Sequence, residues 1–315
     1  MFGKMMNNYY YGKSGKGDYR KEDLPTNRWQ LFGEMLRIRL SGLMRLNLMY
    51  AVPWIPAIIV MLLCGLSWYS SLANLVETYA QDAPALSAAM SQLNTSLLFT
   101  MSLWLIPCLV ITGPFTAGVA YVTRNWARDE HAFVWGDFKD AVKENWKQAL
   151  GVSALTSLVP LVVVVCWTFY GRMAVQTPLM MAPQMISLML GLVWALMLIY
   201  LYPLMVTYQL TFKQLLRNAF LLAIGRLPQS LGLRLATLLP LLIGFGVAYF
   251  IGQIHWVVFA LLIYYALIGF ALSRFAFASY ANAVFDRYIN VHIEGAQVNR
   301  GLNIDADDDD EDDEE

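Results

Sequence analysis

The most prominent pattern in this sequence is a set of long apolar runs separated by polar, charged segments. A helix needs about 20 mostly apolar residues to cross the ~30 Å hydrocarbon core of a bilayer. The runs of roughly this length cover residues 48–69, 97–122, 151–169, 185–208, 235–252 and 256–282. They lack the two-residue alternation of barrel strands. The pattern therefore predicts an all-α, polytopic membrane protein with six transmembrane helices.

Prolines recur at similar places in alternate spans. Pro53, Pro160 and Pro240 each follow a short polar or small stretch and precede a continuing apolar run. This favours three parallel helical-hairpin repeats, related by an axis along the membrane normal. The alternative is that proline is simply tolerated in membrane helices, where neighbouring groups satisfy the freed carbonyl.

Two segments outside the spans have apolar residues at helical spacing. Residues 27–45 and 138–150 each combine an apolar stripe with basic residues, and Asp137 is placed to cap the second segment. Both are predicted to be interfacial helices that lie in the headgroup plane. They could serve as a docking surface for a cytoplasmic partner, or only as elbows that orient the following span.

Composition and charge distribution support membrane residence and suggest an orientation. The chain is 58% hydrophobic and 14% charged, which argues against an ordinary soluble enzyme. Nine Lys or Arg residues precede the first span, five lie between spans two and three, and four lie between spans four and five. On the opposite side Arg172 is the single basic residue. Both termini are therefore expected in the cytoplasm.

The net charge of −1 conceals an acidic C-terminal stretch, because residues 305–315 hold ten of the 23 acids. We expect three parts: a flexible polar and basic tail over 1–26, a membrane domain over 27–292 and a disordered acidic tail over 293–315. The acidic tail could bind a basic partner, fold over the protein's own basic face, or merely be solvated.

The sequence offers little for catalysis or cofactor binding. It contains no HExxH or GxSxG motif, and its three histidines are far apart. No acidic or basic residue lies in the central part of any span, where coupled transporters usually keep one. We therefore predict no catalytic, metal or cofactor site, and the protein is not expected to be an enzyme.

Some residues are nevertheless candidates for contact with a partner or lipid. They are Arg124, Arg128, Asp129, Glu130, His131, Lys139, Lys143, Lys147 and Arg274. A solvated loop or an interfacial anchor is the alternative for each of them, and Arg274 in particular is placed to snorkel to the interface. Pro114 and Pro203 are candidate helix breaks that could line a cavity.

Three segments resemble the YesL-like family of bacterial integral membrane proteins. They are QLFGEMLRIRLSGLMRLNLMY (30–50), GPFTAGVAYVTRNWARDEHAFVWGDFKDAVKENWKQAL (113–150) and YPLMVTYQLTFKQLLRNAFLLAIGRLPQSL (202–231). The resemblance implies a protein of the bacterial plasma membrane whose molecular activity is uncharacterised. It also implies an association with carbohydrate uptake beside ABC-type sugar importers, and it provides no catalytic residues.

Two functional hypotheses follow. The first is a non-enzymatic protein that assists or regulates a carbohydrate importer through its basic cytoplasmic helices. The second is a small permease with a route between the helical hairpins, lined by Pro114 and Pro203. The lipid bilayer and importer components are the expected partners, and nucleic acid is not.

Overall fold

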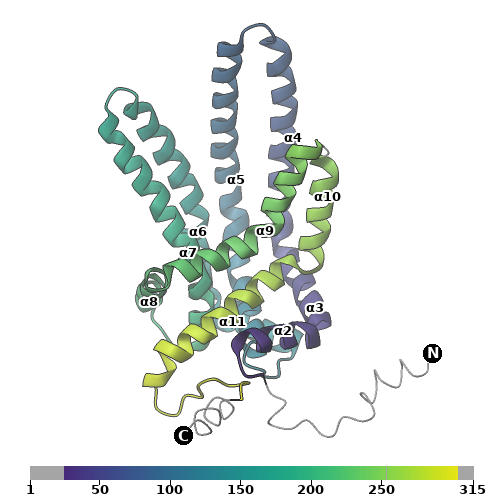
Figure 1. The fold of residues 1–315 in the computed structure, drawn as a ribbon, viewed down its shortest axis with the longest axis vertical. Helices are drawn as coiled ribbons and strands as arrows, with labels where there is room; N and C mark the ends of the chain where they lie inside the picture. Colours follow the sequence, from purple (N-terminus) through teal and green to yellow (C-terminus); the bar gives the residue numbers. More distant parts are fainter. Residues whose placement is uncertain (1–24, 253, 304–315) are drawn as a thin grey trace, which may run out of the picture.

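The computed structural model describes residues 25–252 and 254–303, and over these residues it is a bundle of helices without a strand (Figure 1). The helices are α2 (Arg28–Ile38), α3 (Leu40–Ala51), α4 (Ile55–Thr78), α5 (Ala83–Trp126), α6 (Val134–Ala174), α7 (Met181–Thr207), α8 (Phe212–Gly225), α9 (Leu227–Ile251), α10 (Ile254–Tyr264) and α11 (Phe270–Tyr288). Single short helical turns join α3 to α4, α6 to α7 and α10 to α11.

Six helical segments are long and apolar enough to cross a membrane, which confirms the predicted number of spans. They are Leu40–Thr78, Ala83–Trp126, Val134–Ala174, Pro178–Thr207, Leu227–Ile251 and Ile254–His292. Successive spans form the hairpins α4–α5, α6–α7 and α9–α10 (Figure 1). The threefold repeat itself stays a prediction.

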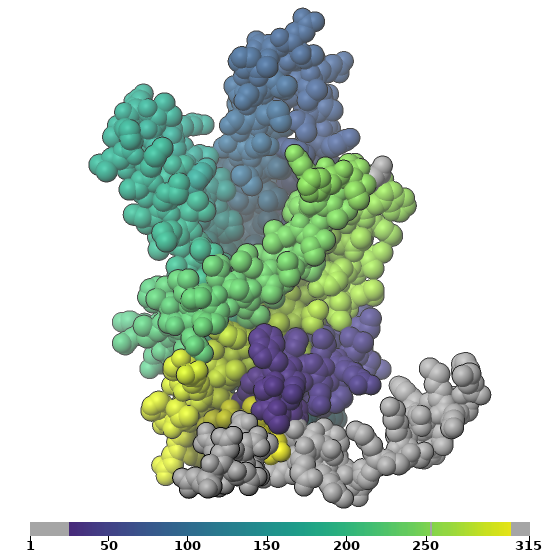
Figure 2. All heavy atoms as spheres, viewed as in Figure 1, coloured from purple at the N-terminus to yellow at the C-terminus, as the bar shows by residue number. Residues whose placement is uncertain are grey.

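The molecule has two dissimilar ends. We call the end that carries α2, α8, the turn 127–133 and residues 286–303 the base. We call the opposite end, with the turns 79–82 and 175–177, the hairpin end. The α4–α5 and α6–α7 hairpins diverge towards the hairpin end, and Figure 2 shows a hollow between their two lobes.

The buried core lies in the half of the bundle next to the base. One cluster joins α5, α6, α7, α8 and α11 around Tyr200 and Phe285, and the other joins α2, α3, α5, α6 and α11 around Trp126 and Phe275. The outer parts of the hairpins contribute little to either cluster, and their large side chains are mostly exposed. Lipid is the natural environment for that apolar surface.

Helices α5 and α6 approach closely near the base because glycines on α5 leave room for α6. A Cβ at Gly113 would lie 2.3 Å from Ser153 Oγ and 2.4 Å from the Ala149 carbonyl oxygen. A Cβ at Gly118 would lie 2.7 Å from the Phe138 ring. Small residues allow such close packing between membrane helices, where lipid removes the usual hydrophobic drive.

This contact corrects the prediction for residues 138–150. They do not form a separate helix in the headgroup plane but are the first part of α6, which continues into the span. Phe138, Val142 and Ala149 of the apolar stripe lie against the α5 glycines, whereas Trp146 of the same stripe is exposed. Asp137 is not the N-cap; helix α6 begins at Val134, and the Asp137 carboxylate accepts the Phe133 backbone N–H at 2.8 Å.

Two further predictions about helix continuity are also wrong. Helices α5 and α7 run through Pro114 and Pro203, so neither proline breaks its helix. The segment 27–45 is interrupted at Arg39 into α2 and α3. Asn27 caps α2 by accepting the Gln30 N–H at 2.9 Å.

The irregular backbone lies elsewhere, in a π-helical turn over Tyr265–Gly269. Asn47 of α3 is fully buried beside this turn. Its Nδ2 donates to the carbonyls of Tyr265 at 2.9 Å and Ala266 at 2.7 Å, and its Oδ1 accepts the Ala271 N–H at 2.9 Å. One side chain thus satisfies the backbone groups that the turn frees, which apolar surroundings require.

Candidate functional site at the base

The turn 127–133 connects the two longest helices and forms the centre of the base. Its backbone reverses direction at Asp129, which has a φ of 52°, and the Glu130 N–H donates to the Asn125 carbonyl at 2.8 Å. The last turn of α5 is held from α11, because Asn282 Nδ2 donates to the Arg124 carbonyl at 3.2 Å. The sequence thus folds this charged loop into a fixed surface.

Glu130 holds the C-terminal segment against this turn. Its Oε1 lies 3.0 Å from Arg128 Nε and 3.3 Å from Arg300 Nη1. Arg128 also donates to the Gln297 carbonyl at 3.4 Å. Because Glu130 and Arg128 are partly shielded, this small network is worth more than an isolated surface pair.

A second, more buried network centres on Asp286 at the end of α11. The carboxylate pairs with the Arg28 guanidinium of α2, and it accepts Asn290 Nδ2 at 2.6 Å and the Asn299 N–H at 3.1 Å. Arg28 donates in addition to Asn299 Oδ1 at 3.1 Å. Asp286 is 5% exposed, so these bonds replace the water that burial removes.

Tyr208, which follows the last residue of α7, extends the Asp286 network. Its hydroxyl donates to Asn290 Oδ1 at 2.7 Å. Burial, together with the negative charge of Asp286, raises the pKa of Tyr208 to about 12. Burial also lowers the pKa of the Arg28 guanidinium, an effect that the neighbouring Asp286 carboxylate opposes.

The two networks join segments that are far apart in the sequence. The Asn303 N–H donates to the Pro25 carbonyl at 3.0 Å, so the first and last described residues meet at the base. Residues 293–303, which were predicted to belong to the disordered tail, pack on α2, α11 and the turn 127–133. The other parts of the predicted tails over 1–26 and 293–315, which are residues 1–24 and 304–315, lie outside the described residues.

The structure brings only some of the predicted contact residues together. Arg128 and Glu130 form an ion pair, and Arg124 lies beside them at the end of α5. Asp129 and His131 are exposed on the same turn, and the His131 ring meets the Phe133 ring edge-on. A separate exposed row on the first part of α6 is formed by Lys139, Lys143 and Lys147. Arg274 belongs to neither group and stacks on Tyr202 and Phe277.

Sequence reasoning missed Arg28, Asp286 and Asn299, of which Asp286 is buried and the other two are partly buried. Their pairing spans most of the chain, and no local pattern indicates it. A weak signal was available for Asp286, which is an acid directly after an apolar stretch at the end of a span. Such a residue needs a partner when it is buried.

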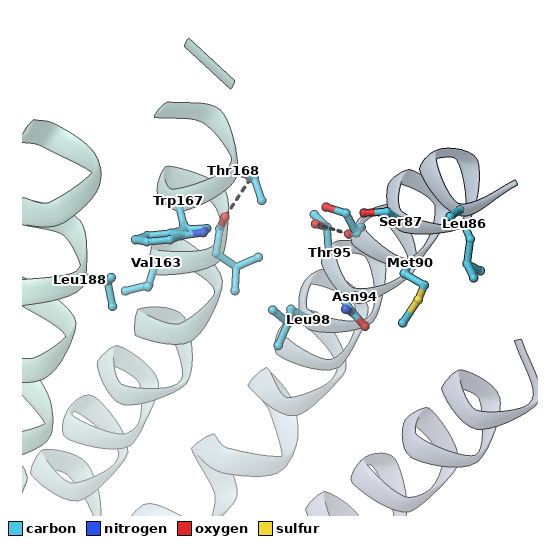
Figure 3. A pocket seen from close by; sticks show the side chains of 13 residues that line it. Leu86, Ser87, Met90, Asn94, Thr95, Leu98, Val163, Trp167, Thr168 and Leu188 are labelled. Atoms are coloured by element: carbon cyan, nitrogen blue, oxygen red, sulfur yellow. Dashed lines mark hydrogen bonds between the residues drawn. The ribbon is translucent and has the colours of Figure 1, made fainter. Parts of the chain in front are cut away.

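A groove lies between the diverging hairpins, at the other end of the molecule. It has a volume of about 820 Å³ and is bounded by the outer part of α5 and by α6 and α7. Figure 3 shows Trp167 and Thr168 of α6 on one side and polar residues of α5, among them Asn94 and Thr95, on the other. Pro114 and Pro203 do not line it.

Neither region has the features of a metal centre. Within residues 25–252 and 254–303, no group of three His, Cys, Asp or Glu residues could hold a metal ion. The cysteines Cys64, Cys108 and Cys166 are unpaired and half-buried in separate helices. What the base offers chemically is a fixed arrangement of charges and hydrogen-bonding groups, suited to binding.

Comparison with known proteins identifies one segment. Residues 92–167 match DUF624, a family described as a protein of unknown function. DUF624 is the domain of YesL-like proteins, so the match confirms the resemblance over these residues. It covers most of α5, the turn 127–133 and most of α6, including the Lys139–Lys147 row. No curated protein and no solved structure matches the chain.

Proposed function

We propose that this chain is a non-enzymatic protein of the bacterial plasma membrane that assists or regulates another membrane protein through its base. The observation that carries the proposal is the combination of a fixed polar scaffold with an exposed basic row, Lys139, Lys143 and Lys147, beside it. A surface intended for a partner benefits from such pre-organisation, because less ordering is needed on binding. The family resemblance suggests an ABC-type sugar importer as the partner.

The proposal includes an orientation with the base and both termini in the cytoplasm. The exposed Arg37 of α2 and the exposed lysines of the first part of α6 lie at the base, whereas Arg172 lies at the hairpin end. Basic residues are retained on the cytoplasmic side during insertion. Accessibility of single cysteines at positions 143 and 82 to a membrane-impermeant thiol reagent tests this, in a background without the native cysteines.

Cross-linking in native membranes, followed by purification and mass spectrometry, tests the partner. We expect importer components to be recovered with the unaltered protein. Replacing Lys139, Lys143 and Lys147 with Gln should reduce the recovery several-fold, whereas Arg172→Gln at the hairpin end should leave it unchanged. Recovery of no importer component from either protein would contradict the proposal.

The groove at the hairpin end favours a second candidate function, a small permease. Its wall combines the indole of Trp167 with the hydroxyl and amide groups of Thr95, Thr168 and Asn94, a combination that suits an uncharged polar solute. Below the groove, the close contact at Gly113 leaves no room between α5 and α6, so transport would require these helices to separate. Solute flux in proteoliposomes that is abolished by Trp167→Ala would support this candidate.

A further inference from the structure

Two arginines of different spans share one aromatic ring near the base. The guanidinium carbon of Arg234, on α9, lies 5.0 Å from the centre of the Phe277 ring, and that of Arg274, on α11, lies 5.8 Å from it. Arg274 also lies 5.5 Å from the centre of the Tyr202 ring. Two positive charges are thus held together in one patch, which consists of Tyr202 of α7, Arg234 of α9, and Arg274 and Phe277 of α11.

Neither charge is balanced by a described residue. The ion pairs in residues 25–252 and 254–303 use Asp286 and Glu130, and neither involves Arg234 or Arg274. Arg234 donates through Nη2 to the Ala195 carbonyl, but its Nε is buried without a hydrogen-bond partner. Arg274 has no hydrogen-bond partner in the described part of the chain. Stacking on an aromatic ring attracts a guanidinium but leaves its in-plane N–H donors free.

The depth of the pair places it at the boundary of the hydrocarbon core. Arg234 is in the second turn of α9, directly before the apolar run that begins at Leu235. Arg274 is likewise in the second turn of α11, which follows the π-helical turn over Tyr265–Gly269. Arg234 and Arg274 are themselves partly exposed, and Leu235, the next residue of α9, is 49% exposed. The patch is therefore open to lipid at the level of the headgroups.

We propose that Arg234 and Arg274 bind the phosphate of an anionic lipid headgroup in the leaflet that faces the base. A guanidinium offers a planar pair of donors that matches two phosphate oxygens, and two guanidinia without a carboxylate select an anion. Basic pockets between transmembrane helices bind acidic headgroups in this way. The inference does not depend on the importer partner.

The test measures lipid retention by the full chain in nanodiscs of phosphatidylcholine with phosphatidylglycerol, using native mass spectrometry after detergent exchange. We expect phosphatidylglycerol to stay bound to the unaltered protein. Arg274→Gln should weaken retention about tenfold, and Arg274→Lys should weaken it less because the charge remains. Lys213→Gln, which removes the same charge from an exposed position of α8, should change it less than twofold.

Thermal unfolding distinguishes the binding site from a folding defect. Arg274→Gln should unfold at nearly the same temperature as the unaltered protein in pure phosphatidylcholine, and should lose the stabilisation that phosphatidylglycerol provides. Equal loss of retention in Lys213→Gln would overturn the site, because attraction would then be diffuse. Equal stabilisation by inorganic phosphate in phosphatidylcholine would overturn the lipid assignment. If Arg274→Gln no longer changed lipid retention or thermal stability once residues 305–315 were deleted, the acidic segment and not a lipid would be the occupant.

Discussion

The base and the hairpin end of this molecule are built on opposite principles. At the base, side chains from α2, the turn 127–133, Tyr208, α11 and the C-terminal segment meet in two polar networks above a packed core. At the hairpin end, α4–α5 and α6–α7 diverge and leave a groove of about 820 Å³. The difference indicates that the base fixes the relative positions of the helices, while the outer hairpins depend on lipid or a ligand to fill the space between them.

The largest effect is expected where α5 touches α6 near the base. A Cβ introduced by Gly113→Ala would clash with the Ala149 carbonyl oxygen at 2.4 Å, and a backbone atom cannot rotate away. We expect a loss of more than about 3 kcal/mol of stability. Gly65→Ala in α4 is the matched control, because nothing lies within 4 Å of its Cβ position. Chemical unfolding in detergent measures both, and equal stability would refute the close contact.

Removal of the central carboxylate of the base comes next. Asp286→Ala leaves the Arg28 guanidinium and the Asn299 N–H without their partner, and we expect a loss of about 3 kcal/mol. The counterpart at the hairpin end is Asp82→Ala, which removes a cap on the Ala85 N–H at 3.0 Å and should cost about 1 kcal/mol. A larger cost for Asp82→Ala would reverse the comparison between the two ends.

The π-helical turn supplies a prediction inside the membrane domain. Asn47→Leu removes the partners of two carbonyls and one N–H in an apolar setting. We expect a loss of about 2 kcal/mol. The exposed Asn74 of α4 is the control, and Asn74→Leu should change stability by less than about 0.5 kcal/mol. Similar unfolding curves for the two variants would show that Asn47 does not support the turn.

The smallest effect concerns pH. The pKa of Tyr208 is raised to about 12 in the folded protein, against 10.0 ordinarily. The unfolded chain therefore releases this proton first, and stability falls as pH rises from 10 to about 12. Tyr208→Phe lacks this contribution, so its stability should fall less over the same range. Parallel pH dependence in the two proteins would contradict the buried environment assigned to Tyr208.

The all-helical class and the number of membrane-spanning segments could be predicted from the sequence because the length of each apolar run determines them. That residues 138–150 are the first part of α6 could not be predicted from the sequence. An apolar stripe can pack against lipid or against glycines of another helix, such as Gly113 and Gly118. The prolines did not predict helix breaks, because α5 and α7 continue through Pro114 and Pro203. At the base, Arg128 and Glu130 were found because they are close in sequence. The pairing of Arg28 with Asp286 was missed because only the tertiary fold brings them together.

Hydrogen–deuterium exchange of the protein in nanodiscs tests most directly whether the base is one coupled unit. We expect slow exchange in α2, in the turn 127–133 and in residues 293–303, and faster exchange in the turn 79–82. In Asp286→Ala, exchange should rise in all three base segments together while the hairpin end is unchanged. A rise confined to residues next to position 286, or an equal rise at both ends, would contradict the account.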